Sequence, residues 1–333
     1  MIWLYALGYF LCYAPYSALT KVVSKDVAGS ELLPITTLAS LAAMITFLTA
    51  AGWWRHAGHR RILGRQVPVP GVWTALSGLA TAAIIATTTL AYTFDGVSIV
   101  LMMLLMRGGV LVLAPVVDAA SKRRVRPSAW IALALSLAAL LVAGLGGTSR
   151  ALTLVAVLDV AVYLAGYFVR LRFMSRLAKS DDRSASIRYF VEEQMVATPA
   201  IVAFLLLLAL VGHGETMLAV RRGFTDVWSS DALVPGIVIG LLSQGTGVFG
   251  ALILLDGREN AFCVPVNRAS SVLAGVVATT VLAALDFGRA APHGELAGAG
   301  LVLGAIVALA LPSLTNRKKG LPCLTRKSSA SRT

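Results

Sequence analysis

Long apolar runs dominate the chain, and short polar segments separate them. A bilayer core about 30 Å thick needs about 20 apolar residues per helix. Strands in lipid would leave their edge backbone groups unpaired, so each run is expected to be a helix. The pattern predicts an all-α integral membrane protein with ten transmembrane helices and no connection long enough for a soluble domain. The expected spans are residues 2–20, 32–54, 71–92, 97–117, 128–146, 151–170, 189–212, 233–255, 260–285 and 297–313.

Composition supports lipid as the main solvent. Of the 333 residues, 57% are apolar and 14% are charged, and the mean hydropathy is +0.80. Soluble domains are about 25% charged, and a soluble core of this size still needs a polar shell. A soluble enzyme and a nucleic-acid reader are therefore excluded. The first apolar run has no basic stretch before it and is too long for a signal-peptide core, so we expect a retained helix.

The basic residues predict the orientation. With the N-terminus inside, the inner segments carry 21 of the 29 Lys and Arg residues, and the outer loops carry 6. This bias favours ten spans with both termini cytoplasmic. It also explains the net charge of +13 through contact with anionic lipid headgroups rather than nucleic acid. Arginine excess and Ala/Leu/Gly richness hint at a bacterial inner membrane. The basic tail, residues 316–333, is expected to be disordered.

An internal repeat divides the chain. Residues 5–10 read YALGYF and residues 163–168 read YLAGYF, an offset of 158. Asp-Gly pairs at 95 and 256 each precede an arginine, Arg107 or Arg268, by twelve residues. Apolar sequences also match by chance, but aromatics, Asp and Arg are the uncommon letters here. We expect one repeat at 1–148 and a second at 149–315; since each holds five helices, the second must be inverted.

The chain resembles the drug/metabolite transporter superfamily. The resemblance rests on ten spans in a five-plus-five repeat, short loops, the fourth run LMRGGVLVLAP at 105–115, and RPSAW at 126–130. It covers about residues 1–315 and points to the ten-helix branch, with EamA-type permeases and nucleotide-sugar and triose-phosphate translocators. The resemblance implies that basic residues of the fourth and ninth helices, here Arg107 and Arg268, hold an anionic substrate. The sugar-phosphate relatives' second basic residue is absent, because Ala269 follows Arg268.

Arg107 and Arg268 both lie near the middle of an apolar run. An intramembrane arginine costs about 3 kcal/mol or more and usually faces a cavity or a partner. The repeat would place both guanidinium groups near one central axis, where an anion would relieve their repulsion. The alternative is that each arginine has its own structural counter-ion, with Asp159, Glu192 and Glu193 as candidates. The two interpretations stay open at this point.

Aromatic and amide side chains complete the candidate substrate site. Tyr9 shares a face of the first helix with Tyr13, and Tyr163 and Tyr167 share a face of the sixth. A buried phenol needs a partner or a wet cavity, so we favour cavity lining over interfacial anchoring for the deeper tyrosines. The predicted substrate contacts are Arg107, Arg268, Tyr9, Tyr167 and Asn267.

Three acidic residues and Tyr163 are candidates for coupling or gating. Asp159 lies mid-span without a repeat counterpart, so it is either a proton carrier or the salt-bridge partner of an arginine. Glu192 and Glu193 lie near the cytoplasmic end of the seventh run. They either form a gate or sit favourably at a helix N-terminus.

These features predict a secondary transporter that moves a small anionic or zwitterionic organic solute by alternating access. The alternatives are efflux of amphiphilic or cationic compounds, a flippase for a phosphorylated lipid carrier, and a membrane scaffold. The sequence shows no nucleophile elbow, metal cluster or phosphate loop, so we expect neither an enzyme nor a cofactor. The expected partners are the solute and the lipid bilayer, with no nucleic acid; a homodimer is compatible with the sequence.

Overall fold

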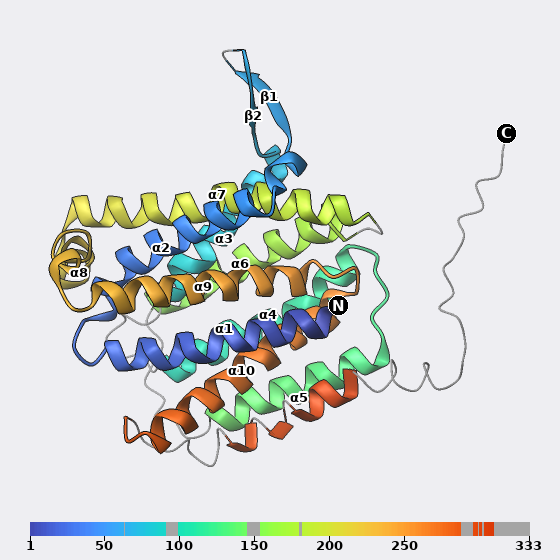
Figure 1. Cartoon of the computed structure of the whole chain (residues 1–333). Helices are drawn as coiled ribbons and strands as arrows, with labels where there is room; N and C mark the ends of the chain where they lie inside the picture. Colours follow the sequence, from blue (N-terminus) through green and yellow to red (C-terminus); the bar gives the residue numbers. More distant parts are fainter. Residues whose placement is uncertain are drawn as a thin grey trace.

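The computed structural model of the chain is a bundle of long helices that run along a common direction (Figure 1). It describes residues 1–62, 64–90, 99–144, 154–179, 182–287, 296–298, 300–301 and 303–309. The elements are α1 (Ile2–Val23), α2 (Gly29–Ala50), the 3-10 turn η1 (Trp53–His56), β1 (His59–Ile62), β2 (Arg65–Pro68), α3 (Val72–Leu90), α4 (Ile99–Ala120), α5 (Pro127–Gly144), α6 (Leu154–Leu177), α7 (Arg183–Val211), α8 (Gly214–Thr225), η2 (Val227–Ser229), α9 (Leu233–Leu254) and α10 (Asn260–Ala284).

The apolar runs predict the long helices well. Nine runs each coincide with one long helix, and the described residues of the tenth, between 296 and 309, are helical. The largest differences lie between the sixth and seventh runs, because α6 continues to Leu177 and α7 already begins at Arg183. A hydropathy pattern shows only which part of a helix is apolar enough to lie in lipid. The backbone hydrogen bonds of the helix can continue past that part into polar residues. Arg188, one residue before the predicted seventh run, therefore lies within α7.

A capping residue explains the early start of α7. Asp182 accepts hydrogen bonds from the Ser184 backbone N–H and from the Ser184 hydroxyl, each at 2.8 Å. These bonds hold the pKa of the Asp182 carboxyl below its ordinary value. At the other end, Gly212 adopts φ 58° as the left-handed C-cap.

Length and hydropathy identify a membrane-embedded protein. Within the described residues, five helices are long and apolar enough to cross a membrane, namely Gly29–Ala50, Leu154–Leu177, Ser184–Val211, Leu233–Leu254 and Asn260–Ala284. The outer faces are apolar too. On α1, Leu4, Leu7 and Leu11 are 52–69% exposed, while Ala6 and Tyr9 on the opposite face are buried. Such a leucine-covered exterior around a partly polar interior is the arrangement that lipid favours.

The helices pack in a recurring set of pairs. α1 lies against α9 and α10, and α2 lies against α9. On the other side of the bundle, α6 packs against α3 and α4, and α7 packs against α3. α10 also contacts α4 and α5. The central helices α4 and α10 therefore meet each other and, between them, reach both α1 and α6.

Two connections carry structure that the sequence pattern did not predict. Residues 59–68 form an antiparallel hairpin with Arg61 opposite Gln66. The amphipathic helix α8 lies between α7 and α9 and packs on α2 and α7, where Arg222 pairs with Glu31 at 3.5 Å. Both segments are too short or too polar to appear as apolar runs, so a search for spans passes over them.

Candidate functional site

Arg107 of α4 and Arg268 of α10 each lie nine residues into a helix, about 12 Å from its first residue. The Arg107 Nη2 donates to the Tyr13 hydroxyl of α1 at 3.2 Å. The Arg268 Nη2 donates to the Tyr163 hydroxyl of α6 at 3.4 Å. Each arginine therefore extends from a central helix to a phenol on a neighbouring helix.

Arg268 is held mainly by aromatic rings. Its guanidinium carbon lies 5.2 Å from the ring centroid of Tyr167, which is the range of a cation–π contact. Its Nε is buried and has no hydrogen-bond partner among the residues that the structure describes. Phenol groups are neutral, so they do not balance the positive charge of the Arg268 guanidinium. The buried Nε–H, which lacks a partner, favours binding of an additional hydrogen-bond acceptor.

Four tyrosines join the two arginines into one group, which we call the Arg–Tyr cluster (Arg107, Arg268, Tyr9, Tyr13, Tyr163 and Tyr167). Tyr9 stacks on Tyr13 with ring centroids 5.5 Å apart, and the Tyr163 and Tyr167 centroids are 4.9 Å apart. Tyr9 and Tyr163 are both buried. The cluster thus takes its side chains from α1, α4, α6 and α10.

Asn267 joins this cluster through a glycine of α9. A Cβ placed on Gly250 would lie 3.1 Å from the Tyr9 ring and 3.3 Å from the Asn267 Nδ2. Gly250 therefore lets α9 approach Tyr9 and Asn267 closely. The structure brings Arg107, Arg268, Tyr9, Tyr167 and Asn267 into one neighbourhood. Tyr13, which the sequence placed on the right helix face, is additionally the phenol that binds Arg107.

Asp159 lies one helical turn before Tyr163 on α6. It is buried, and its Oδ2 has no hydrogen-bond partner among the described residues. None of the ion pairs found in the described part of the chain includes Asp159. The counter-ion alternative for this residue is thus without support there, and the proton-carrier hypothesis stays a prediction.

Glu193 has a different partner from the one that the sequence suggested. Its Oε1 accepts from the Arg170 Nε at 2.9 Å, and its Oε2 accepts from the Arg170 Nη2 at 3.0 Å. Ser77 and Thr81 of α3 donate to the same carboxylate at 2.9 and 3.1 Å. Both charged side chains are almost fully enclosed. The Arg170–Glu193 ion pair and its two hydroxyl donors link α3, α6 and α7. Glu193 is therefore engaged in a structural ion pair.

Glu192 holds the connection between α2 and α3. Its two oxygens accept from the backbone N–H groups of Gly58 and Gly71, at 3.0 and 2.8 Å, and from the Thr74 hydroxyl. The Arg188 Nε donates to it at 2.8 Å. Glu192 lies in the third turn of α7, so the interpretation of Glu192 and Glu193 as helix N-terminal residues is wrong. The sequence misplaced the N-terminus of α7, because the helix, capped by Asp182, already begins at Arg183, nine residues before Glu192.

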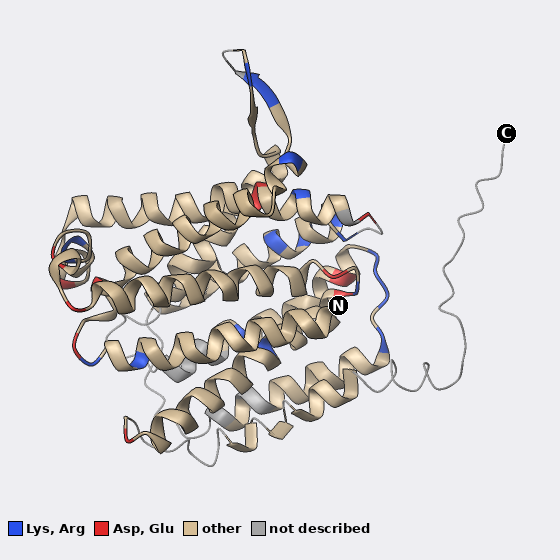
Figure 2. Cartoon of the chain, viewed as in Figure 1, with Lys and Arg blue, Asp and Glu red and all other residues tan. Residues whose placement is uncertain are grey.

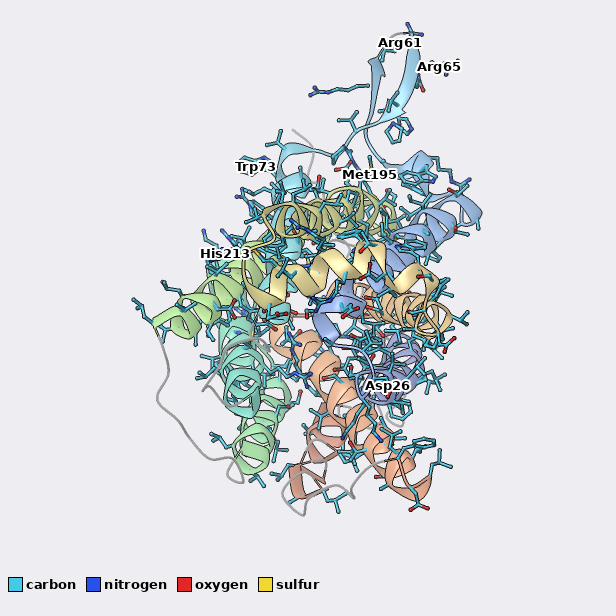
Figure 3. The ribbon with its side chains drawn as sticks, turned by 90° about the vertical axis from the view of Figure 1, so that its left-hand side faces the viewer. Asp26, Arg61, Arg65, Trp73, Met195 and His213 are labelled. Carbon is cyan, nitrogen blue, oxygen red and sulfur yellow. The ribbon has the colours of Figure 1, made fainter. Side chains whose placement is uncertain are left out.

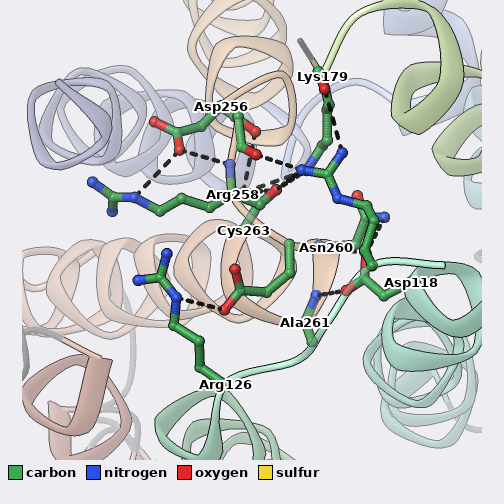
Figure 4. Close-up of polar contacts among 11 residues, drawn as sticks. Asp118, Arg126, Lys179, Asp256, Arg258, Asn260, Ala261 and Cys263 are labelled. Carbon is green, nitrogen blue, oxygen red and sulfur yellow. Dashed lines mark hydrogen bonds and ion pairs between the residues drawn. The ribbon is translucent and has the colours of Figure 1, made fainter. Parts of the chain in front are cut away.

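A second polar group ties the corner between α9 and α10 to the ends of α4 and α6 (Figure 4). The fully buried Asp118 of α4 accepts from the Asn260 backbone at 2.9 Å, the Asn260 side chain at 2.8 Å and the Ala261 backbone at 2.7 Å. It thereby caps α10 from another helix. Asp256 accepts from the Arg258 backbone N–H at 3.2 Å; Asp95 lies outside the described residues.

Removal of the Asp118 carboxylate is expected to destabilise this corner. Asp118→Ala leaves the backbone N–H groups of Asn260 and Ala261 without an acceptor, at a cost of about 2–3 kcal/mol; the Asn260 side-chain amide keeps its bond to the Ser175 hydroxyl. Thermal unfolding of the purified protein in detergent measures the effect, with the exposed Asp231→Ala as the control. Equal melting temperatures for the two variants would show that the cap contributes nothing to stability.

The comparisons with known proteins identify only a fold. No family model matches the chain, and no curated protein matches it. One solved structure, whose title reads "Crystal structure of protein", is similar with a TM-score of 0.53 and 15% sequence identity. The alignment covers 96% of this chain and 98% of that chain, so the likeness extends over the whole helical bundle.

Proposed function

We propose that this membrane protein is a secondary transporter for a small anionic or zwitterionic organic solute. The observation that carries the proposal is the Arg–Tyr cluster, in which Arg107 and Arg268 each donate to a tyrosine hydroxyl and Arg268 also lies on the Tyr167 ring. A carboxylate or phosphate suits the planar guanidinium fork of arginine. The solute would lie between the helices that supply these side chains, with Asn267 as a further contact.

The proposed architecture is ten transmembrane helices in two inverted repeats, 1–148 and 149–315, of the EamA type. Two glycines at the 158-residue offset support it. Gly8 of α1 lies against Phe249 of α9, and Gly166 of α6 lies against Ile84 of α3. If α1 corresponds to α6 and α3 to α9, these are equivalent contacts.

The helix pairs follow the same correspondence. The pairs α1–α9 and α2–α9 have the counterparts α6–α3 and α7–α3, and the pair α1–α10 has the counterpart α6–α4. Repeats of this kind alternate access by rocking one half against the other. We place the protein in a bacterial inner membrane with both termini cytoplasmic. The tail, residues 316–333, lies outside the described residues.

Asp159 gives the proposal a means of coupling. Its buried carboxylate lies one turn from Tyr163, which binds Arg268. A proton on Asp159 would change the charge beside the cluster as the solute binds or leaves. The same carboxylate is the reason to keep efflux of amphiphilic or cationic compounds as a second candidate function.

A ligand screen by thermal shift separates the two candidates. Purified protein is heated with carboxylates, organic phosphates and amphiphilic cations, since a ligand of the folded state raises the apparent melting temperature. We expect stabilisation by an acid and none by the cations. Stabilisation by cations alone, lost in Asp159→Asn and retained in Arg268→Gln, would instead establish the second candidate.

A further inference from the structure

The hairpin β1–β2 projects away from the bundle, across the direction in which the long helices run. Both the view along the bundle's side and the view turned by 90° show this direction (Figures 1 and 3). Since the helices cross the membrane, a segment that lies across their direction runs along the membrane surface. Arg61 and Arg65 lie far from the bundle, near the tip (Figure 3). We call residues 59–68 the basic arm; residue 63 is not described.

The arm and its base carry only positive charge. Residues 52–71 contain Arg55, Arg60, Arg61 and Arg65 but no Asp or Glu. All four arginines are exposed, and none belongs to an ion pair among the described residues. Among the charged residues that Figure 2 colours, the arm carries basic ones and no acidic one. Such a concentration of unpaired charge makes the arm a site for a negatively charged surface.

The base of the arm is fixed to the bundle. Gly58 and Gly71, which flank the hairpin, both donate their backbone N–H groups to Glu192. The Val69 N–H donates to the Gly58 carbonyl at 2.6 Å, which closes the base. A Cβ on Gly58 would lie 3.1 Å from the Val69 carbonyl oxygen, so glycine permits this close crossing. The base of the arm is therefore fixed to Glu192 of α7, and this attachment sets the direction of the arm.

Aromatic residues indicate the depth of the arm. Trp53 of the turn before it packs against Phe47 and Phe190, with ring centroids 5.2 and 5.8 Å away. Trp54 donates from its Nε1 to the Thr49 hydroxyl at 3.0 Å. Trp73, just after the arm, is 59% exposed. Tryptophans concentrate at the level of the lipid headgroups, so the arm leaves the bundle at that level.

We propose that the basic arm binds anionic phospholipid headgroups of the leaflet in which its base lies. Its direction keeps all four arginines near one membrane surface, and arginine binds phosphate with its planar fork. The bonds from Gly58 and Gly71 to Glu192 hold the base of the arm at a constant position beside α7. This explains the role of Glu192, which the transport proposal does not use, and it does not depend on transport.

Lipid titration of the full chain tests the proposal. The protein is placed in phosphatidylcholine nanodiscs with increasing phosphatidylglycerol, and bound phosphatidylglycerol is counted by native mass spectrometry. The test variant is Arg60→Gln with Arg61→Gln and Arg65→Gln. The control removes three exposed cations elsewhere, as Lys122→Gln with Arg124→Gln and Arg176→Gln.

We expect the arm variant to need about tenfold more phosphatidylglycerol for the same occupancy, since each basic residue near the surface contributes. The control variant should stay within about twofold of the wild type. Equal losses in both variants would overturn the proposal, because general charge would then be responsible. Binding of a labelled oligonucleotide by the wild type but not by the arm variant, with phosphatidylglycerol binding unchanged, would assign the arm to a soluble polyanion instead.

Discussion

Arg268→Gln is expected to lower solute affinity and transport by more than about 100-fold while the protein stays folded. The substitution removes the charge and the fork that would bind an acidic group, and hydrogen bonds to charged groups contribute about 1.5–3 kcal/mol each. Two such bonds correspond to a loss of at least two powers of ten, at 1.4 kcal/mol per tenfold. Transport is measured in proteoliposomes with the acid that shifts the wild-type melting temperature most.

Two further variants make this test specific. Arg268→Lys keeps the charge without the fork and should retain part of the affinity. Arg176→Gln is the control: it removes an exposed arginine outside the Arg–Tyr cluster, and this variant should transport normally. Normal transport by Arg268→Gln would contradict the anion site, since the solute would then have no need of the guanidinium group.

Glu193→Ala is expected to have the largest effect on stability. It leaves the Arg170 charge buried without its bidentate partner, which costs about 3–5 kcal/mol. We expect the apparent melting temperature in detergent to fall by roughly 10 °C. The exposed Glu215, 3.8 Å from Arg222, provides the matched control, because Glu215→Ala removes only a surface ion pair.

A double variant identifies the cause of that loss. Arg170→Met combined with Glu193→Leu removes both charges together, so no isolated charge remains. Replacement of a buried pair by apolar residues is often close to neutral. Recovery of most of the lost stability is therefore expected. A double variant as unstable as Glu193→Ala would point to packing or to the Ser77 and Thr81 bonds as the source.

The buried acids show where sequence reasoning reached its limit. The sequence identified Asp159, Glu192 and Glu193 as unusual because carboxylates are rare in apolar runs. It could not assign their partners, since Glu193 binds an arginine 23 residues away and Glu192 binds the backbone of Gly58, 134 residues away. A backbone donor has no signature in the sequence. The sequence likewise missed Asp118 as the cap of α10.

The sequence by itself determined the solvent, the positions of the long helices and the two arginines that define the candidate site. Lipid excludes unpaired backbone and penalises charge, so apolar length and rare polar residues are strong signals. Only the tertiary structure decided which phenol meets which arginine, which acid is bound in an ion pair, and that residues 59–68 form an arm. These features depend on contacts between helices, which the order of residues along one helix does not contain.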